Sequence, residues 1–271
     1  MFNYLFFRTF AFLTGFFSLV ATHPSYADDM QLAGLFAQHN LRGTLVIESI
    51  DGQHRFVHNQ ARSGQRFVPA STFKIPHTLI ALQEMAVHPQ EILLWDGQQH
   101  PYPPWNRNHT LASAFKYSCV WCFQELAKRL GPQAYGHYLQ EMAYGTAVAG
   151  PKLTNFWLQG DLKISAKEQI AFLRKLYLQQ LPFSPQHFST LKQIMQVEKT
   201  EDYQIYAKTG WAAKVYPQVG WYVGYVVGKR GVWMFALNMK VNNREQLSLR
   251  KSLVMEALRL KKIQPAMTEI P

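Results

Sequence analysis

The chain has 271 residues and carries 28 Lys and Arg against 17 Asp and Glu, so its formal net charge is +11. These charges are scattered without long runs, which argues against a nucleic-acid partner and is compatible with a cleft that attracts small anions. Hydrophobic residues make up 48% of the sequence, and it contains no internal repeat or low-complexity linker. The composition is therefore that of a globular protein with a sizeable core.

Residues 1–27 have the pattern of a cleavable signal peptide. One arginine precedes an apolar run over 10–20, which is shorter than a bilayer span requires, and the segment ends in Ser25-Tyr26-Ala27. We expect cleavage before Asp28, export to the periplasm and a mature domain over 28–271 with no membrane anchor. The sequence leaves open whether that domain is a monomer or a homodimer.

The first mature segment predicts a helix and a hairpin. An amphipathic pattern runs over 28–39, and two strand-like runs follow at 43–49 and 54–58. Asp51-Gly52 lies between these runs and is typical of a tight turn. We expect the two strands to pair antiparallel.

The middle of the chain is mainly helical. Apolar spacing of the helical period predicts helices over 72–87, 110–117, 118–130, 132–144, 165–178 and 184–197. Pro76 should distort the first of these near its start, and Ser165 with Glu168 forms a capping box at the fifth. Irregular loops are expected at 94–105 and 150–160.

Strand patterns return at 203–208, 219–227 and 231–240, and a last helix is expected over 245–262. This order predicts an α+β fold in which an antiparallel sheet is flanked by terminal helices and an all-helical region is inserted. The α/β part takes residues 28–65 and 200–271, and the mainly helical part takes 66–199.

Ser71 and Lys74 are the strongest candidates for chemistry. Three residues apart on a helix, their side chains share one face, and a neutral amine can activate a serine hydroxyl for acyl transfer. Ser-x-x-Lys occurs four times in the chain, however, and the other three copies lie inside amphipathic helical patterns where a surface lysine is the ordinary interpretation. The spacing alone therefore does not single out Ser71.

The two cysteines, Cys119 and Cys122, form a Cys-x-x-Cys motif. A disulfide across one helical turn is geometrically conceivable in an exported protein. A thioredoxin-like redox role would need a strand before the helix, and a helix is expected there instead. We interpret the pair as two small apolar side chains in a buried helix, and the sequence leaves open whether they are joined. The histidines show no metal-binding spacing, so we expect no metal.

Lys208-Thr209-Gly210 occurs once, at the end of a predicted strand. Lysine and threonine suit the binding of a carboxylate, and glycine would leave room for a ligand along the strand edge. Taken alone, the motif could also be a strand-end turn. Together, Ser71-x-x-Lys74, Ser118-Cys119-Val120 and Lys208-Thr209-Gly210 have the order of the motifs in serine β-lactamases and penicillin-binding proteins.

The chain resembles the OXA-type class D β-lactamases over nearly its whole mature length. The resembling stretches are Pro69-Ala70-Ser71-Thr72-Phe73-Lys74-Ile75-Pro76, Ser113-Ala114-Phe115-Lys116-Tyr117-Ser118, Phe156-Trp157-Leu158, Leu162-Lys163-Ile164-Ser165, Lys208-Thr209-Gly210 and Gly220-Trp221-Tyr222-Val223-Gly224. The resemblance implies a β-lactamase/transpeptidase-like fold and hydrolysis of the β-lactam ring of penicillins and related antibiotics.

The resemblance also implies how the reaction runs. Ser71 would be the nucleophile, and Lys74, carboxylated by CO2 and hydrogen-bonded by the Trp157 indole, would be the general base, with no other cofactor. The residues support this assignment, because the segment 146–162 contains no glutamate that could activate water. An apolar pocket would also keep the lysine neutral, and only a neutral amine reacts with CO2.

Further roles carry over from the family by position. Ser118 would relay protons between Lys74 and the leaving nitrogen. Lys208 would adjust the proton affinity of Ser118. The backbone N–H groups of Ser71 and Trp211 would form the oxyanion hole. The remaining positions match residues that bind the substrate carboxylate (Thr209 and Arg250) or wall its pocket (Val120, Leu158 and Trp105).

The chain departs from the family at three loop positions. Thr146 stands where asparagine is usual after Tyr-Gly, Gln159 replaces a common glutamate, and Asp161 replaces a common proline. We expect the loop beside Trp157 to differ in shape but not the chemistry.

Two other functions remain open. A penicillin-sensing domain and a cell-wall transpeptidase share this fold and are acylated without hydrolytic turnover. A sensor needs membrane helices before the domain, and a transpeptidase usually carries extra domains or an anchor. We expect neither, so the sequence favours the hydrolase.

Overall fold

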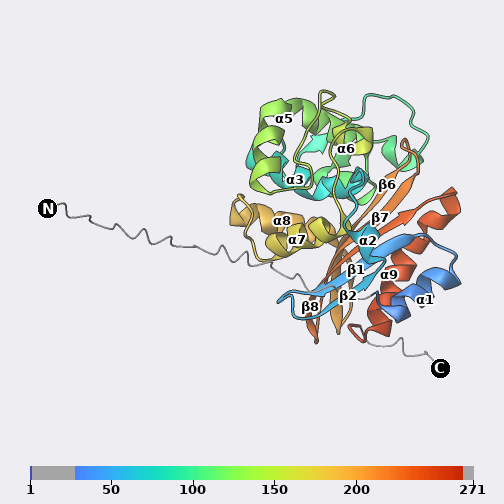
Figure 1. Ribbon diagram of the computed structural model, residues 1–271. Coiled ribbons are helices and arrows are strands. Elements are labelled where there is room, and N and C mark those ends of the chain that lie inside the picture. The colour runs from blue at the N-terminus through green and yellow to red at the C-terminus, as the bar shows by residue number, and fades with distance from the viewer. Residues whose placement is uncertain (2–27, 265–271) are drawn as a thin grey trace.

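The computed structural model describes Met1 and residues 28–264, so the expected signal peptide lies outside the described part of the chain. A six-stranded antiparallel sheet runs through these residues in the order β2-β1-β8-β7-β6-β5 (Figure 1). Its strands are β1 (Gly43–Ser49), β2 (Arg55–His58), β5 (Gln196–Lys199), β6 (Tyr203–Ala212), β7 (Val219–Gly228) and β8 (Gly231–Lys240). The N-terminal hairpin, β1 and β2, thus forms one edge of the sheet, with β1 paired to β8, the last strand of the chain.

One face of the sheet is covered by the terminal helices, α1 (Met30–Gln38) and α9 (Leu249–Leu260). Alternate residues of the strands point into this layer, for example Leu45 and its cross-strand partner Leu237. Both side chains are fully buried. The strand side chains on this face and the apolar faces of α1 and α9 therefore pack into one hydrophobic core.

The other face carries the helical region (Figure 1). Its helices are α3 (Lys74–Gln83), α4 (Leu111–Lys116), α5 (Val120–Glu141), α6 (Phe156–Gln159), α7 (Ala166–Tyr177) and α8 (Pro185–Met195). Short elements complete the chain: α2 (Gln60–Ser63), η1 (Ala70–Phe73), η2 (Pro103–Trp105), η3 (Arg244–Leu247), β3 (Ile92–Leu93) and β4 (His109–Thr110). The predicted α+β class, with its inserted helical region, is confirmed.

Several predicted boundaries differ from the structure. The helix expected from residue 72 begins as the 3-10 turn η1, and the helix expected to reach 197 ends at Met195, after which β5 pairs with β6. The predicted break at Gly131 is a kink inside α5, where φ is +73° and Pro132 follows. The division into 28–65 plus 200–271 and 66–199 stays a prediction, with β5 inside the range expected to be helical.

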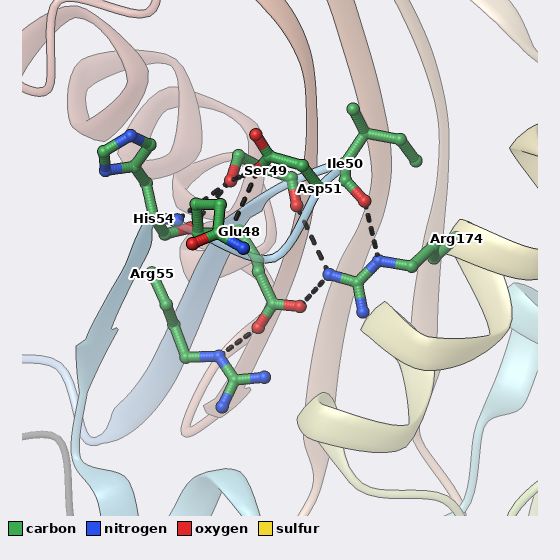
Figure 2. A network of polar contacts seen from close by, with 8 residues as sticks. Glu48, Ser49, Ile50, Asp51, His54, Arg55 and Arg174 are labelled. Carbon is green, nitrogen blue, oxygen red and sulfur yellow. Dashed lines mark hydrogen bonds and ion pairs between the residues drawn. The ribbon is translucent and has the colours of Figure 1, made fainter. Parts of the chain in front are cut away.

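A buried carboxylate ties the helical region to the sheet (Figure 2). Glu48 on β1 is 1% exposed and forms ion pairs with Arg55 on β2 and with Arg174 on α7. Arg174 also donates from Nε to the Ile50 carbonyl, at 3.1 Å. Since a buried charge is stable only when it is paired, these contacts fix α7 against the N-terminal hairpin.

No helix in the described residues is long and apolar enough to cross a membrane.

Candidate active site

Ser71 and Lys74 lie where η1 passes into α3. Lys74 Nζ is 3.4 Å from Ser71 Oγ, and the two residues are 0% and 8% exposed respectively. Ala70, just before the serine, has a φ of +50°, a backbone conformation that non-glycine residues adopt at a free-energy cost. The turn therefore holds the hydroxyl near the amine, and both residues are shielded from solvent.

Strand β6 packs closely against η1. A Cβ on Gly210 would lie 3.0 Å from the Pro69 carbonyl oxygen and 3.1 Å from Thr72 Cγ2. The glycine of the Lys-Thr-Gly motif therefore permits close approach of the strand to the nucleophile turn. The motif was expected to end its strand, but β6 continues to Ala212.

The Lys74 amine lies in apolar surroundings. Its Nζ is 4.6 Å from the centre of the Phe123 ring. Burial, and secondarily the positive charge of Lys208, holds the pKa of Lys74 well below its ordinary value of 10.5. A neutral amine beside a serine hydroxyl can accept its proton.

Trp157 on α6 is fully buried beside the start of α3. Its ring packs 5.9 Å from that of Phe73 and 5.4 Å from that of His77, centre to centre. The indole Nε1 is buried and has no hydrogen-bond partner within the described chain. A buried N–H without an acceptor is unfavourable, so this donor is placed to serve a group that binds or forms nearby.

Ser118 and Lys208 meet from distant parts of the chain. Lys208 Nζ donates a hydrogen bond of 2.5 Å to Ser118 Oγ and another of 3.1 Å to the Thr209 carbonyl. Ser118 precedes α5 with a φ of +55°. Burial, and then the charge of Arg250, lowers the pKa of Lys208 to about 7, so this lysine exchanges protons near neutral pH.

Arg250 reaches the same strand from α9. Its Nη1 donates to the Gly210 carbonyl at 2.6 Å and its Nε to the Leu247 carbonyl at 2.7 Å. Burial lowers the pKa of Arg250 to about 10, which leaves it a cation at neutral pH. Thr209 and Trp211 flank Gly210 and are both half-buried. The predicted carboxylate-binding residues therefore lie together along β6, next to Lys208.

The three predicted wall residues are half-buried and adjoin the predicted catalytic residues. Trp105 donates from its indole to the Tyr117 carbonyl at 2.9 Å, one residue before Ser118. Val120 begins α5 two residues after that serine, and Leu158 follows Trp157 on α6.

The cysteines differ from our sequence interpretation. Cys119 and Cys122 form a disulfide, with their Cα atoms 5.5 Å apart, and both are fully buried. Cys119 caps α5 instead of lying inside a helix, and at this helix start the two side chains meet within bonding range. The view of two separate apolar side chains was wrong.

The sequence interpretation also missed His77 and Tyr135. His77 Nε2 lies 2.7 Å from the Tyr135 hydroxyl, and both side chains are fully buried. Burial, and then the charge of Lys74, holds the pKa of His77 well below 6.5, so the ring is neutral. The spacing of His77 one helical turn after Lys74 was the available signal for a polar group behind the amine.

Thr146, where the family usually has asparagine, joins the backbone segments before and after α6. Its Oγ1 donates to the Asp161 carbonyl at 2.9 Å and accepts from the Lys163 backbone N–H at 3.0 Å. A threonine hydroxyl both donates and accepts, so it can bridge two backbone segments of a loop. Thr146 and Asp161, two of the three departures from the family pattern, therefore meet in one contact.

Known proteins are similar to this chain over most of its length. A family model described as the penicillin binding protein transpeptidase domain matches residues 40–259. Beta-lactamase OXA-48 of Klebsiella pneumoniae is 40% identical over 231 residues, which cover 85% of this chain and 87% of that protein. Beta-lactamase OXA-2 of Salmonella typhimurium is 37% identical over 259 residues, 93% of either chain.

Solved structures are similar over the same length. The class D β-lactamase FUS-1 (OXA-85) from Fusobacterium nucleatum subsp. polymorphum has a TM-score of 0.85 at 31% identity, covering 88% of this chain and 99% of its own. The class D β-lactamase YbXI from Nostoc has a TM-score of 0.84 at 35% identity, covering 85% and 98%.

Proposed function

The chain belongs to the class D β-lactamases, and from that premise we propose that it hydrolyses the β-lactam ring of penicillins and related antibiotics through an acyl-enzyme on Ser71. The observation that carries this proposal is the fully buried Lys74 amine, 3.4 Å from the serine hydroxyl and with a lowered pKa. A buried neutral amine can react with CO2, and the resulting carbamate is an anionic base that could drive both formation and hydrolysis of the ester.

Acylation begins when the base at Lys74 takes the Ser71 proton and Oγ attacks the lactam carbonyl. The backbone N–H groups of Ser71 and Trp211 then donate to the oxygen that becomes negative. Their elements are held together by the close approach of Gly210 to η1. Only small movements are then needed as charge develops.

We propose that CO2 carboxylates Lys74 and that the carbamate is the general base in both half-reactions. The surroundings fit a carbamate: burial lowers the pKa of Lys74 and so favours the neutral amine, its pocket is apolar, and the buried Trp157 Nε1 lacks an acceptor among the described residues. The carbamate would supply an anionic base for activating water. Trp157 would donate to one of its oxygens, and the apolar ring of Phe123 would limit its solvation.

Ser118 and Lys208 would carry the proton that reaches the lactam nitrogen. Their hydrogen bond places a lysine with a pKa of about 7 against a hydroxyl, so either can donate near neutral pH. The ring nitrogen leaves as an amine only if it is protonated, and the Ser118 hydroxyl supplies that proton.

The substrate carboxylate would lie along β6. Thr209 offers a hydroxyl, and Lys208 and Arg250 provide positive charge in a partly desolvated site, where attraction to an anion is strong. Trp105, Val120 and Leu158 would wall the remainder of the substrate.

Turnover of a chromogenic cephalosporin by the mature protein tests the proposal. With bicarbonate added and substrate in large excess, we expect sustained hydrolysis well beyond one equivalent. A single stoichiometric burst would contradict it and identify a penicillin-sensing or transpeptidase-like acyl acceptor.

Trp157→Phe tests the role of the carbamate. Removing its hydrogen bond should slow deacylation by about 10- to 100-fold and leave acylation less affected, with partial rescue by bicarbonate. Carbon-13 NMR after labelling with 13CO2 should show a carbamate signal that weakens in this variant. Trp233→Phe is the control, because it removes an indole N–H that donates to the Arg230 carbonyl in the β7–β8 hairpin and has no part in the proposed reaction. Equal bicarbonate dependence in the two variants would count against the mechanism.

A further inference from the structure

A second group of reactive side chains lies behind Ser118. His109 on β4 meets Cys119 and Cys122 at the start of α5, and the nitrogen and sulfur atoms of the three lie within 4.8 Å of one another. The three residues are at most 1% exposed. None of them has a part in the proposed reaction.

Ser113 holds one side of the His109 ring. Its Oγ lies 2.9 Å from His109 Nδ1 and 3.1 Å from the Thr110 carbonyl oxygen. The hydroxyl can donate to either atom, so a neutral His109 can carry its proton on Nδ1 or on Nε2. His109 Nε2 is buried, and the ring also interacts with the Pro104 backbone, which favours its protonated form. With its proton on Nδ1, a neutral His109 would have the Nε2 lone pair free for a ligand.

A neutral histidine with a free Nε2 lone pair has the form that ligates metals. Metal-binding histidines coordinate through one ring nitrogen while a fixed partner holds the other, as Ser113 holds Nδ1 here. Cysteines spaced as Cys-x-x-Cys supply two thiolates from one helix start. The backbone N–H of Cys122 already donates to Cys119 Sγ at 3.2 Å, and that contact would stabilise a thiolate.

We propose that the reduced form of this cluster is a binding site for one thiophilic divalent ion, such as Cd2+ or Zn2+, with His109 Nε2, Cys119 Sγ and Cys122 Sγ as ligands. A dithiol reductant opens the disulfide, giving two cysteine thiols and the reductant's own disulfide. Metal binding then displaces the two thiol protons to solvent. Soft thiolate donors with one imidazole select such ions over Mg2+ or Ca2+.

The site adjoins the proposed catalytic machinery. Cys119 follows Ser118 directly, and Ser118 already has a φ of +55°. A metal that draws Cys119 Sγ toward His109 would move the serine hydroxyl relative to Lys208. We therefore expect metal to inhibit the reduced enzyme; this consequence rests on the proposed function, but metal binding does not.

Titration with Cd2+ tests the binding. The mature protein is reduced with a dithiol, freed of reductant without air and titrated, with the oxidised protein as a control of identical sequence. We expect one Cd2+ per chain, with thiolate-to-metal charge-transfer absorption and a cadmium-113 NMR signal, in the reduced protein only.

Substitutions then identify the ligands. His109→Asn should weaken Cd2+ binding at least about tenfold. Cys119→Ser combined with Cys122→Ser should abolish it. His137 lies on α5, as Cys122 does, but outside the cluster, so His137→Asn should leave Cd2+ binding unchanged.

Three results would overturn the proposal. The first is reduced protein that keeps its circular dichroism but binds no Cd2+, and the second is an unchanged affinity in His109→Asn. The third is loss of the folded signal on reduction, because the site requires a folded dithiol. Metal binding without inhibition would overturn only the link to Ser118.

Discussion

The two faces of the sheet are built from the same strands but bury different kinds of side chain. Under α1 and α9, aliphatic and aromatic side chains fill the core. On the helical face, the buried ionisable side chains Glu48, Lys74 and Lys208 lie among apolar ones, and only Glu48 has a partner of opposite charge in the described residues. The comparison teaches that desolvation is tolerated on one face because the other supplies stability.

The largest effect should come from Ser71→Ala on the helical face. Loss of the nucleophile is expected to reduce kcat at least about 10^4-fold. The free energy of unfolding should change by no more than about 1 kcal/mol, because a single hydroxyl is removed. Steady-state kinetics and urea unfolding measure the two quantities, and residual turnover within about a hundredfold of wild type would contradict the assignment.

Leu258→Ala on α9 should produce the reverse pattern. Leu258 is fully buried under the sheet, so truncation should lower the free energy of unfolding by about 2–5 kcal/mol. The kcat of the folded protein should stay the same. Leu260→Ala, at a site 38% exposed on the same helix, is the matched control and should cost less than about 1 kcal/mol. A comparable drop in kcat for Leu258→Ala would show that the two faces are not separable.

A third effect is a pH dependence of stability due to Lys208. Above its ordinary pKa of 10.5 the side chain is neutral in both folded and unfolded protein, so it contributes no penalty. As the pH falls from 10.5 to about 7, only the unfolded chain gains the proton, and the folded state loses stability. Below about 7 the penalty should level off.

Lys208→Met removes this penalty. We expect the variant to gain on wild type in free energy of unfolding as the pH is lowered through that window, measured by urea unfolding at several pH values. The exposed Lys152→Met is the control and should show no such trend. A difference between Lys208→Met and wild type that does not vary with pH would show that Lys208 stays charged in the folded protein.

Much of the fold could be predicted from the sequence because its signals are local. The Asp51-Gly52 turn, the capping box at Ser165 and the strand patterns of β7 and β8 each appear within a few residues. Strand β5 could not be predicted, since its four residues are mostly exposed and gain their structure only by pairing with β6.

The candidate site divides in the same way. The motifs at Ser71, Ser118 and Lys208 were visible because their order along the chain is distinctive. The contact of His77 with Tyr135 was not, since 58 residues separate them and only the packed helices bring them together. The Cys119–Cys122 bond was also missed, because one spacing is compatible with a bridged pair and with two free side chains.

Glu48 has a consequence for how the molecule denatures. Its two arginine partners, Arg55 and Arg174, come from the opening hairpin and from a helix more than a hundred positions later. If either segment detached first, the carboxylate would lose a counter-charge while still enclosed, which is strongly unfavourable. We therefore expect heat to melt the sheet and the helical insertion in a single cooperative transition, with no stable half-unfolded form for proteases to cut.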